Sequence, residues 1–166
     1  MNYDVEVYKL SNDFFNDYPI SEYPELLTME GRPYNCLLID THIDYFICIP
    51  FRTNISPHNS DSYIFKNSNR SKHHNSGLDY QKMLIIKEAR YLENNAIVDQ
   101  DEYSETMSNI DKIVMGAEKY LNTYIAHVNK THILHQRDYD RHYKFSTLPY
   151  FHDILNTSVI SSTMPL

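Results

Sequence analysis

A stripe of apolar side chains that recur three or four residues apart is the strongest pattern in this chain, and it runs from Met107 to Asn129. Its members are Ile110, Ile113, Val114, Ala117, Tyr120, Leu121, Tyr124, Ile125 and Val128. This spacing places them on one face of an α-helix, and that face is wide enough to lie across a β-sheet. The pattern therefore predicts one long helix over residues 107–129 that packs on a sheet.

The residues before this helix supply the sheet. Residues 3–8 alternate between apolar and polar side chains, which is typical of a half-buried strand. Two almost entirely apolar runs, Tyr34–Asp40 and Tyr45–Ile49, flank a polar turn and predict a central β-hairpin. Further elements are expected as strands at 63–65, 78–87 and 96–98, helices at 11–17 and from Leu148, and a mobile polar loop at 67–76. We predict a single α+β domain over residues 1–155, with a compact, mostly antiparallel sheet and packed helices, and a flexible tail at 156–166.

Composition excludes several classes of protein. No apolar run approaches the roughly 18 to 20 residues of a membrane helix, and the first residues do not resemble a signal peptide, so we expect a cytoplasmic protein. Cys36 and Cys48 lie in apolar contexts and are expected to be buried free thiols. The chain has only three glycines, so it can contain neither a phosphate-binding P-loop nor a glycine-rich dinucleotide turn.

Charge is unevenly distributed along the chain. The net charge of −7 argues against a general nucleic-acid-binding protein. Basic residues nevertheless outnumber acidic ones between positions 49 and 90, where they are Arg52, Lys66, Arg70, Lys72, Lys82, Lys87 and Arg90. This segregation predicts a local anion-binding face on an acidic body, and a solvated loop with scattered lysines is the alternative.

A group of residues suited to phosphate chemistry follows the predicted hairpin. Arg52, Thr53 and Asn54 stand at a strand end, His58 follows Pro57 shortly after, and Arg32 precedes the hairpin. RNA cleavage without a metal requires a group that aligns or deprotonates the 2′-hydroxyl, a proton donor for the leaving 5′-oxygen, and cations that stabilise the phosphorane. Thr53, His58 and the two arginines could fill these roles, and a polar loop without chemistry is the alternative.

The histidines of the last quarter have the residue types of a metal site but not its spacing. His127, His132 and His135 lack the pair at i and i+4 with an intervening acid that zinc helices use, so no metal is predicted. Arg137, Arg141 and Lys144 alternate with Tyr139, Tyr143 and Phe145, a combination that favours RNA contact by stacking and phosphate binding. Structural packing of the tyrosines is an equal alternative. Lys82, within an apolar strand, is a candidate phosphate ligand or an ordinary edge lysine.

The order of short motifs over residues 3–90 resembles a known family. The motifs are Val7-Tyr8, Arg32-Pro33-Tyr34, the run from Tyr45 through Pro50-Phe51-Arg52-Thr53 to His58, and Gly77-Leu78 before Met83-Leu84-Ile85-Ile86. In this order they are similar to the RNA-cleaving toxins of type III toxin–antitoxin systems, the ToxN, AbiQ and CptN group.

This resemblance implies a fold and an activity. The fold would be a Kid/MazF-like antiparallel sheet, or partial barrel, with added helices. The activity would be a sequence-preferring endoribonuclease that uses no metal or cofactor and leaves a 2′,3′-cyclic phosphate and a 5′-hydroxyl. The partners would be cellular or phage RNA and a small, folded, repeated antitoxin RNA, such as a pseudoknot. The toxin would process this antitoxin RNA and close with it into a cyclic complex. The role would be phage defence by abortive infection.

The resemblance also assigns residues. Thr53 matches the hydroxyl residue of the family's strand-end motif, Arg52 and Asn54 flank it, and His58 matches a histidine that follows it. Ile55 stands where the family has a lysine, so Arg52 or His58 would take over that cation's role. The expected RNA and phosphate ligands are Arg32, Tyr8, Tyr34, Lys66, Arg70, Lys72, Lys82, Lys87, Arg137, Arg141 and Lys144. The alternatives are a noncatalytic RNA-binding module and a protein–protein interaction domain, and a metal-dependent nuclease is least favoured.

Overall fold

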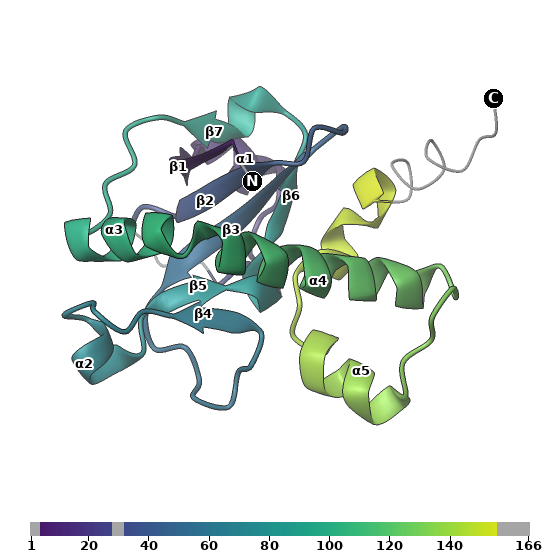
Figure 1. Cartoon of the computed structure of the whole chain (residues 1–166). Coiled ribbons are helices and arrows are strands. Elements are labelled where there is room, and N and C mark those ends of the chain that lie inside the picture. Colours follow the sequence, from purple (N-terminus) through teal and green to yellow (C-terminus); the bar gives the residue numbers. More distant parts are fainter. Residues whose placement is uncertain (1–3, 28–31, 156–166) are drawn as a thin grey trace.

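The structure is a computed structural model that describes residues 4–27 and 32–155 (Figure 1). Within these residues a seven-stranded antiparallel sheet has the order β4-β5-β3-β2-β1-β7, and β6 also pairs with β3. The strands are β1 (Val5–Leu10), β2 (Asn35–Asp40), β3 (Phe46–Arg52), β4 (Ser62–Ile64), β5 (Gly77–Asp79), β6 (Leu84–Ile86) and β7 (Leu92–Glu93). The predicted α+β class and the mostly antiparallel sheet are therefore confirmed.

The β2–β3 hairpin is the centre of the sheet, as its apolar sequence predicts. Cys36 pairs with Pro50 and Ile39 with Ile47, so the start of β2 and the end of β3 lie side by side. Cys36 and Cys48 are both buried as free thiols, in agreement with the sequence. On its other edge β3 pairs with β6 over residues 46–48 and with β5 over residues 51–52. Pro50 lies between these two contacts, where β3 pairs only with β2.

The strand predicted over residues 78–87 is interrupted. A short 3-10 helix, η2 (Tyr80–Lys82), separates β5 from β6. Asp79 begins this turn because its side chain accepts a hydrogen bond from the backbone N–H of Gln81, as a helix N-cap does. The prediction of one continuous strand was therefore wrong, because a local side-chain hydrogen bond outweighed the β propensity of the run.

The remaining helical elements lie mainly in the second half of the chain. They are α1 (Asn12–Asp17), η1 (Pro24–Leu26), α2 (Ser71–His74), η3 (Ala89–Tyr91), α3 (Gln100–Ser108), α4 (Ile110–Val128), α5 (Gln136–Tyr143) and η4 (Leu148–Phe151). Figure 1 shows α3 and α4 running one after the other across the sheet, with α5 beside α4. Among the described residues, no helix has the length and apolar character needed to cross a membrane.

The long predicted helix corresponds to α4. Its buried residues Ile113, Val114, Ala117, Tyr120, Leu121 and Tyr124 are members of the predicted stripe. Met107 belongs instead to α3, because Asn109 ends that helix with its side-chain amide donating to the carbonyl of Glu105. Gly116 allows the helix to lie close to the buried ring of Tyr80, since an added Cβ would stand 2.7 Å from the tyrosine hydroxyl.

Three further segments differ from the sequence-based prediction. Residues 96–98 form no strand, and the Ile97 carbonyl instead accepts a hydrogen bond from the side-chain amide of Asn35. Residues 136–143, for which no element is predicted, form α5, which is capped by the side chain of His135. The loop expected at 67–76 contains α2. The tail predicted for residues 156–166 lies outside the described residues.

Candidate active site

A broad cleft of about 1680 Å³ lies at the end of the sheet where β2 begins and β3 ends. Its lining comes from β1, α1, the start of β2, the end of β3, the residues around α2, the segment from β7 to α3, and α3. Five of the predicted site residues line it together, namely Arg32, Arg52, Thr53, Asn54 and Arg70, and the predicted RNA ligand Tyr34 lines it as well. The hairpin register explains most of this convergence, because it brings the residues before β2 next to those after β3.

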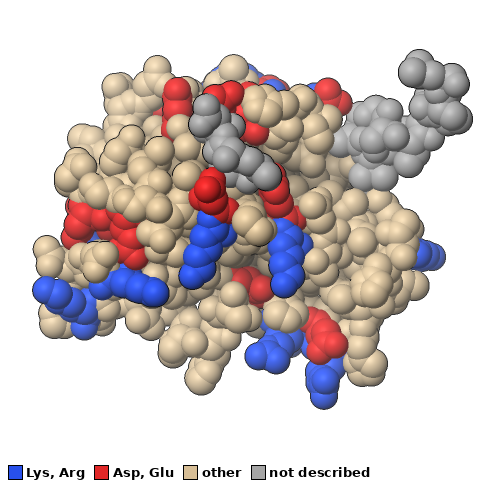
Figure 2. All heavy atoms as spheres, in the orientation of Figure 1, with Lys and Arg blue, Asp and Glu red and all other residues tan. Residues whose placement is uncertain are grey.

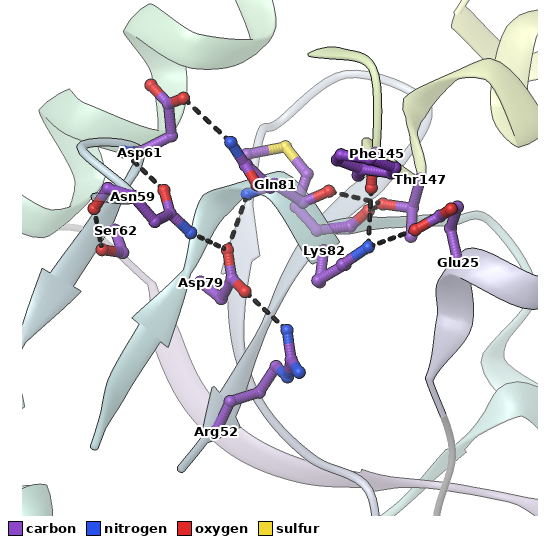
Figure 3. Close-up of polar contacts among 11 residues, drawn as sticks. Glu25, Arg52, Asn59, Asp61, Ser62, Asp79, Gln81, Lys82, Phe145 and Thr147 are labelled. Carbon is purple, nitrogen blue, oxygen red and sulfur yellow. Dashed lines mark hydrogen bonds and ion pairs between the residues drawn. The ribbon is translucent and has the colours of Figure 1, made fainter. Parts of the chain in front are cut away.

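Arg52 is held in place from beneath the cleft. Its guanidinium lies 2.7 Å from a carboxylate oxygen of Asp79, whose side chain is almost completely buried (Figure 3). Asp79 also accepts hydrogen bonds from the side chain of Asn59 and the backbone N–H of Gln81. Burial raises the pKa of the Asp79 carboxyl, and the charge of Arg52 opposes that rise. The arginine therefore has a fixed position at the mouth of the cleft.

The polar network beneath Arg52 extends to α5. The side chain of Gln81 donates to Asp61 at 3.2 Å, and Nδ1 of His142 lies 2.8 Å from the same carboxylate oxygen. Figure 3 shows Asp61, Asn59, Gln81 and Asp79 linked in one series of contacts that ends at Arg52. This network ties the β4–β5 region to α5 and ends at Arg52, which lines the cleft.

Asn54 joins the turn after β3 to the end of α2. Its φ of 57° lies in the left-handed region, which asparagine tolerates better than most residues. Its backbone N–H donates to the carbonyl of His74, and its side-chain oxygen lies 3.1 Å from Nδ1 of the His74 ring. His74 is exposed and lines the cleft beside Thr53 and Asn54.

Glu102 also lines the cleft. It lies in the first turn of α3, is only 4% exposed, and accepts a hydrogen bond from Ser76 at 2.8 Å and 3.1 Å to its two carboxylate oxygens. Burial raises the pKa of Glu102, while the Ser76 hydrogen bond and Arg70 oppose the rise. Beside it, Asp99 pairs with the guanidinium of Arg70 at 2.8 Å.

Sequence reasoning missed both Glu102 and His74. Glu102 stands in an acidic segment far along the chain, and His74 adjoins His73 in what was expected to be a polar loop. The one available signal for His74 was its place in the basic segment 49–90, and nothing in the sequence marks Glu102 as buried. Only the docking of α3 against the residues around α2 brings them to one cleft.

The cleft has an apolar half. Phe15, Ile20, Tyr34, Phe51 and Ile97 line it, and Ile97 is 86% exposed. The hydroxyl of Tyr34 is buried and has no hydrogen-bond partner among the described residues, and burial raises its pKa. Aromatic and aliphatic surface next to arginines and hydroxyls is the combination that binds a nucleobase and its phosphate.

Several other predicted ligands do not line the cleft. His58, Lys66, Lys72 and Lys87 are exposed but lie outside its lining, and Tyr8 is half-buried on β1. Arg137, Arg141 and Lys144 are exposed on or just after α5, outside the lining as well. The tyrosines between them are structural, since Tyr139 stacks on His127 and Tyr143 is buried against Tyr120 and Tyr124.

Lys82 points into the protein. Only 5% of it is exposed, and its ammonium lies 2.6 Å from a carboxylate oxygen of Glu25 and 2.6 Å from the carbonyl of Phe145 (Figure 3). This geometry does not favour the predicted phosphate contact of Lys82, because its ammonium is buried and is engaged by Glu25 and by the Phe145 carbonyl. Lys82, which stands among apolar residues in the sequence, is therefore a buried member of an ion pair.

The molecular surface carries both signs of charge. On the face drawn in Figure 2, basic and acidic side chains are interspersed. Within the cleft, Lys9 pairs with Glu93, in addition to the Arg52–Asp79 and Arg70–Asp99 pairs. Of the basic residues between positions 49 and 90, Arg52 and Arg70 line the cleft, and their charges are partly balanced by these pairs.

The described residues contain one group that could hold a metal ion, and it includes none of the histidines of the last quarter. Asp4, Asp40 and His42 lie together at the β2–β3 turn, where His42 contacts both carboxylates at 3.6–3.7 Å. The histidines of the last quarter are engaged elsewhere: His127 and His135 each accept a backbone N–H, and His142 contacts Asp61. They therefore do not share one site.

No protein-family model, curated protein or solved structure matches this chain. The cleft is accordingly interpreted from its own residues.

Proposed function

We propose that this chain is a metal-independent endoribonuclease whose active site is the cleft at the end of the β2–β3 hairpin. One observation carries the proposal: Arg32, Arg52, Thr53, Asn54 and Arg70, separated by up to 38 positions, line one cleft. These are the residues that the resemblance to type III toxins and the distribution of basic charge selected.

Each residue has a role that its position supports. Thr53, directly after Arg52 on the cleft wall, aligns the 2′-hydroxyl of the substrate. Arg52, fixed by the buried Asp79, stabilises the charge that develops on the phosphorane, because a preorganised cation needs no rearrangement at the moment of reaction. Arg32 and Arg70 bind flanking phosphates, and the apolar half with Tyr34 and Phe51 receives an unpaired base.

The remaining features of the proposal come from the resemblance. The sheet would have the Kid/MazF-like arrangement, the partner would be a folded repeat RNA that the protein cuts and that inhibits it, and the two would form a cyclic complex. The antiparallel sheet with helices packed on it is compatible with this assignment.

The test compares purified protein with its Thr53→Ala variant on total bacterial RNA in EDTA, followed by mapping of the new 5′ and 3′ ends. We expect discrete cuts with 5′-hydroxyl and cyclic-phosphate ends, and a loss of at least about 100-fold in the variant, because misplacing the attacking group costs that much. Thr131→Ala is the matched control, since Thr131 is exposed and bonds only within the α4 terminus.

Two results would contradict the proposal in different ways. Intact RNA with wild-type protein, with binding shown separately, would leave a noncatalytic RNA-binding module. Feeble binding without a steep dependence on salt would instead indicate a protein–protein interaction domain, because phosphate contacts release counterions.

A further inference from the structure

The cleft contains two ionisable side chains that the predicted chemistry does not use. Glu102 comes from α3 and His74 from the end of α2, and both line the same cleft as Arg52 and Thr53. They are connected through the α2 segment: Ser76, two residues after His74, donates its hydroxyl proton to Glu102. His58, the histidine selected by the sequence, is outside the lining and uses its backbone N–H to bond Ser56.

We propose that Glu102 is the general base and His74 the general acid of the cleft. This inference rests on the endoribonuclease activity proposed above and names the two groups that move protons in it. Cyclising RNA cleavage requires one group that accepts a proton and one that donates a proton, and a carboxylate and an imidazolium can fill these two roles.

The reaction balances with these two groups. The Glu102 carboxylate takes the proton of the 2′-hydroxyl, and the 2′-oxygen forms a bond to phosphorus. The bond between phosphorus and the 5′-oxygen breaks, and its electron pair stays on that oxygen, which receives a proton from the His74 imidazolium. The products are a 2′,3′-cyclic phosphate and a 5′-hydroxyl, and the two side chains then regain their starting states by exchanging protons with water.

The surroundings of Glu102 suit a base. Its buried position disfavours the charged form, and its charged neighbours are Arg70, Asp99 and Asp101. Arg70 forms an ion pair with Asp99, which partly neutralises the arginine charge. Arg70 therefore lowers the pKa of Glu102 less than an unpaired arginine would. A carboxylate in such a place holds a proton more tightly than an exposed one and is a stronger base.

The surroundings of His74 suit an acid. Its Nδ1 donates to the side-chain oxygen of Asn54, an atom that can only accept, so Nε2 is the nitrogen that gains and loses the proton. The backbone hydrogen bond from Asn54 to the His74 carbonyl fixes the same pair a second time. The neighbouring ring of His73, at 6.3 Å between centroids, is the other titratable group beside it.

The test measures the rate of cleavage of total bacterial RNA in EDTA between pH 4.5 and 9. We expect a bell-shaped profile for wild type, with an acidic limb lost in Glu102→Gln and an alkaline limb lost in His74→Gln. Each variant should lose about 100-fold to 10,000-fold in rate, the usual contribution of a general acid or base, with binding of a 2′-O-methylated RNA pool unchanged. Each has a matched control outside the cleft: Glu118→Gln, at an exposed position on α4, and His73→Gln in the same histidine pair.

Two milder variants test the assignment without removing either group. Ser76→Ala takes a hydrogen bond away from Glu102 and should move the acidic limb to higher pH. Asn54→Asp places a negative charge beside Nδ1 of His74, which stabilises the imidazolium and should move the alkaline limb to higher pH.

The outcomes separate this inference from the function on which it rests. If wild type cuts RNA and Glu102→Gln or His74→Gln retains its rate and both limbs, the acid–base pair is wrong and the endoribonuclease stands. Limbs that stay in place in Ser76→Ala and Asn54→Asp also overturn the pair. Wild-type protein that leaves RNA intact overturns the endoribonuclease and the pair together.

Discussion

Replacing Lys82 with methionine should destabilise the protein without changing how it handles RNA. Lys82 joins η2 to two distant parts of the chain, because its ammonium contacts Glu25 in η1 and the carbonyl of Phe145 after α5. Methionine keeps most of the apolar stem and removes the charge. The substitution leaves a carboxylate and a carbonyl that have both lost their partner.

The magnitude follows from the exposure of the pair. Removing one member of a fully buried ion pair costs about 3–5 kcal/mol. The Glu25 side chain is 29% exposed and can recover water, so the loss is smaller, about 2–3 kcal/mol. For a chain of 166 residues this corresponds to a fall of about 5–10 °C in Tm.

The assay is urea unfolding followed by circular dichroism, with Lys87→Met as the matched control because Lys87 is exposed. RNA binding and cleavage are then measured below the unfolding range, where we expect both to equal wild type. An unfolding midpoint within error of wild type would refute the structural role of the ion pair. Weakened RNA binding in a variant of undiminished stability would restore the interpretation of Lys82 as a phosphate ligand.

Three further predictions concern other parts of the structure. Glu102→Gln should unfold at a higher temperature than wild type at pH 7: burial raises the pKa of this carboxyl in the folded state, so its stabilising contribution exists at low pH and is lost as pH rises through that pKa. Melting curves at pH 7 and below pH 4 check this, and an equal gain at both would contradict it. Gly77→Ala should cost about 3 kcal/mol of unfolding free energy in a urea titration, since its Cβ would stand 2.2 Å from the backbone carbonyl of Tyr63, and a variant as stable as wild type would show that the two strands can separate. Cys36 and Cys48 should react with iodoacetamide far more slowly in native than in urea-unfolded protein, because both are buried and burial raises the pKa of the Cys48 thiol. Mass spectrometry follows the labelling, and equal rates in the two states would falsify the burial.

Local patterns predicted the elements whose residues decide their own structure. The spacing of the apolar residues in α4 shows which face of the helix is buried. The two continuous apolar runs of the hairpin indicate central strands. Both predictions use only neighbouring residues. Segments that depend on a particular side chain were missed. Asp79 caps η2 and His135 caps α5, each through a single side-chain hydrogen bond. The spacing of apolar residues in the sequence does not reveal such bonds.

The same distinction applies to the cleft. The hairpin places the residue before β2 and the residues after β3 at one end of the sheet, so the meeting of Arg32 with Arg52 and Thr53 follows from a register that the sequence predicts. Glu102 and His74 reach the cleft through contacts between α3 and the residues around α2, which no local pattern encodes. The half of the site carried by strand ends was therefore predictable, and the half carried by docked helices was not.

The acidic and basic segments of the sequence meet in the folded protein, and this contact bears on the proposed function. The acidic residues of α3 lie against the basic segment around α2, and this contact could have neutralised the cations. Most of the acids bind something else: Glu105 accepts the backbone N–H groups of Lys66 and Asn67, and Asp101 accepts that of Asn69. Because backbone donors satisfy these carboxylates, the side chain of Lys66 is exposed and takes part in no ion pair among the described residues. An acidic helix can thus hold a basic segment in place and leave its lysine charge available to a phosphate.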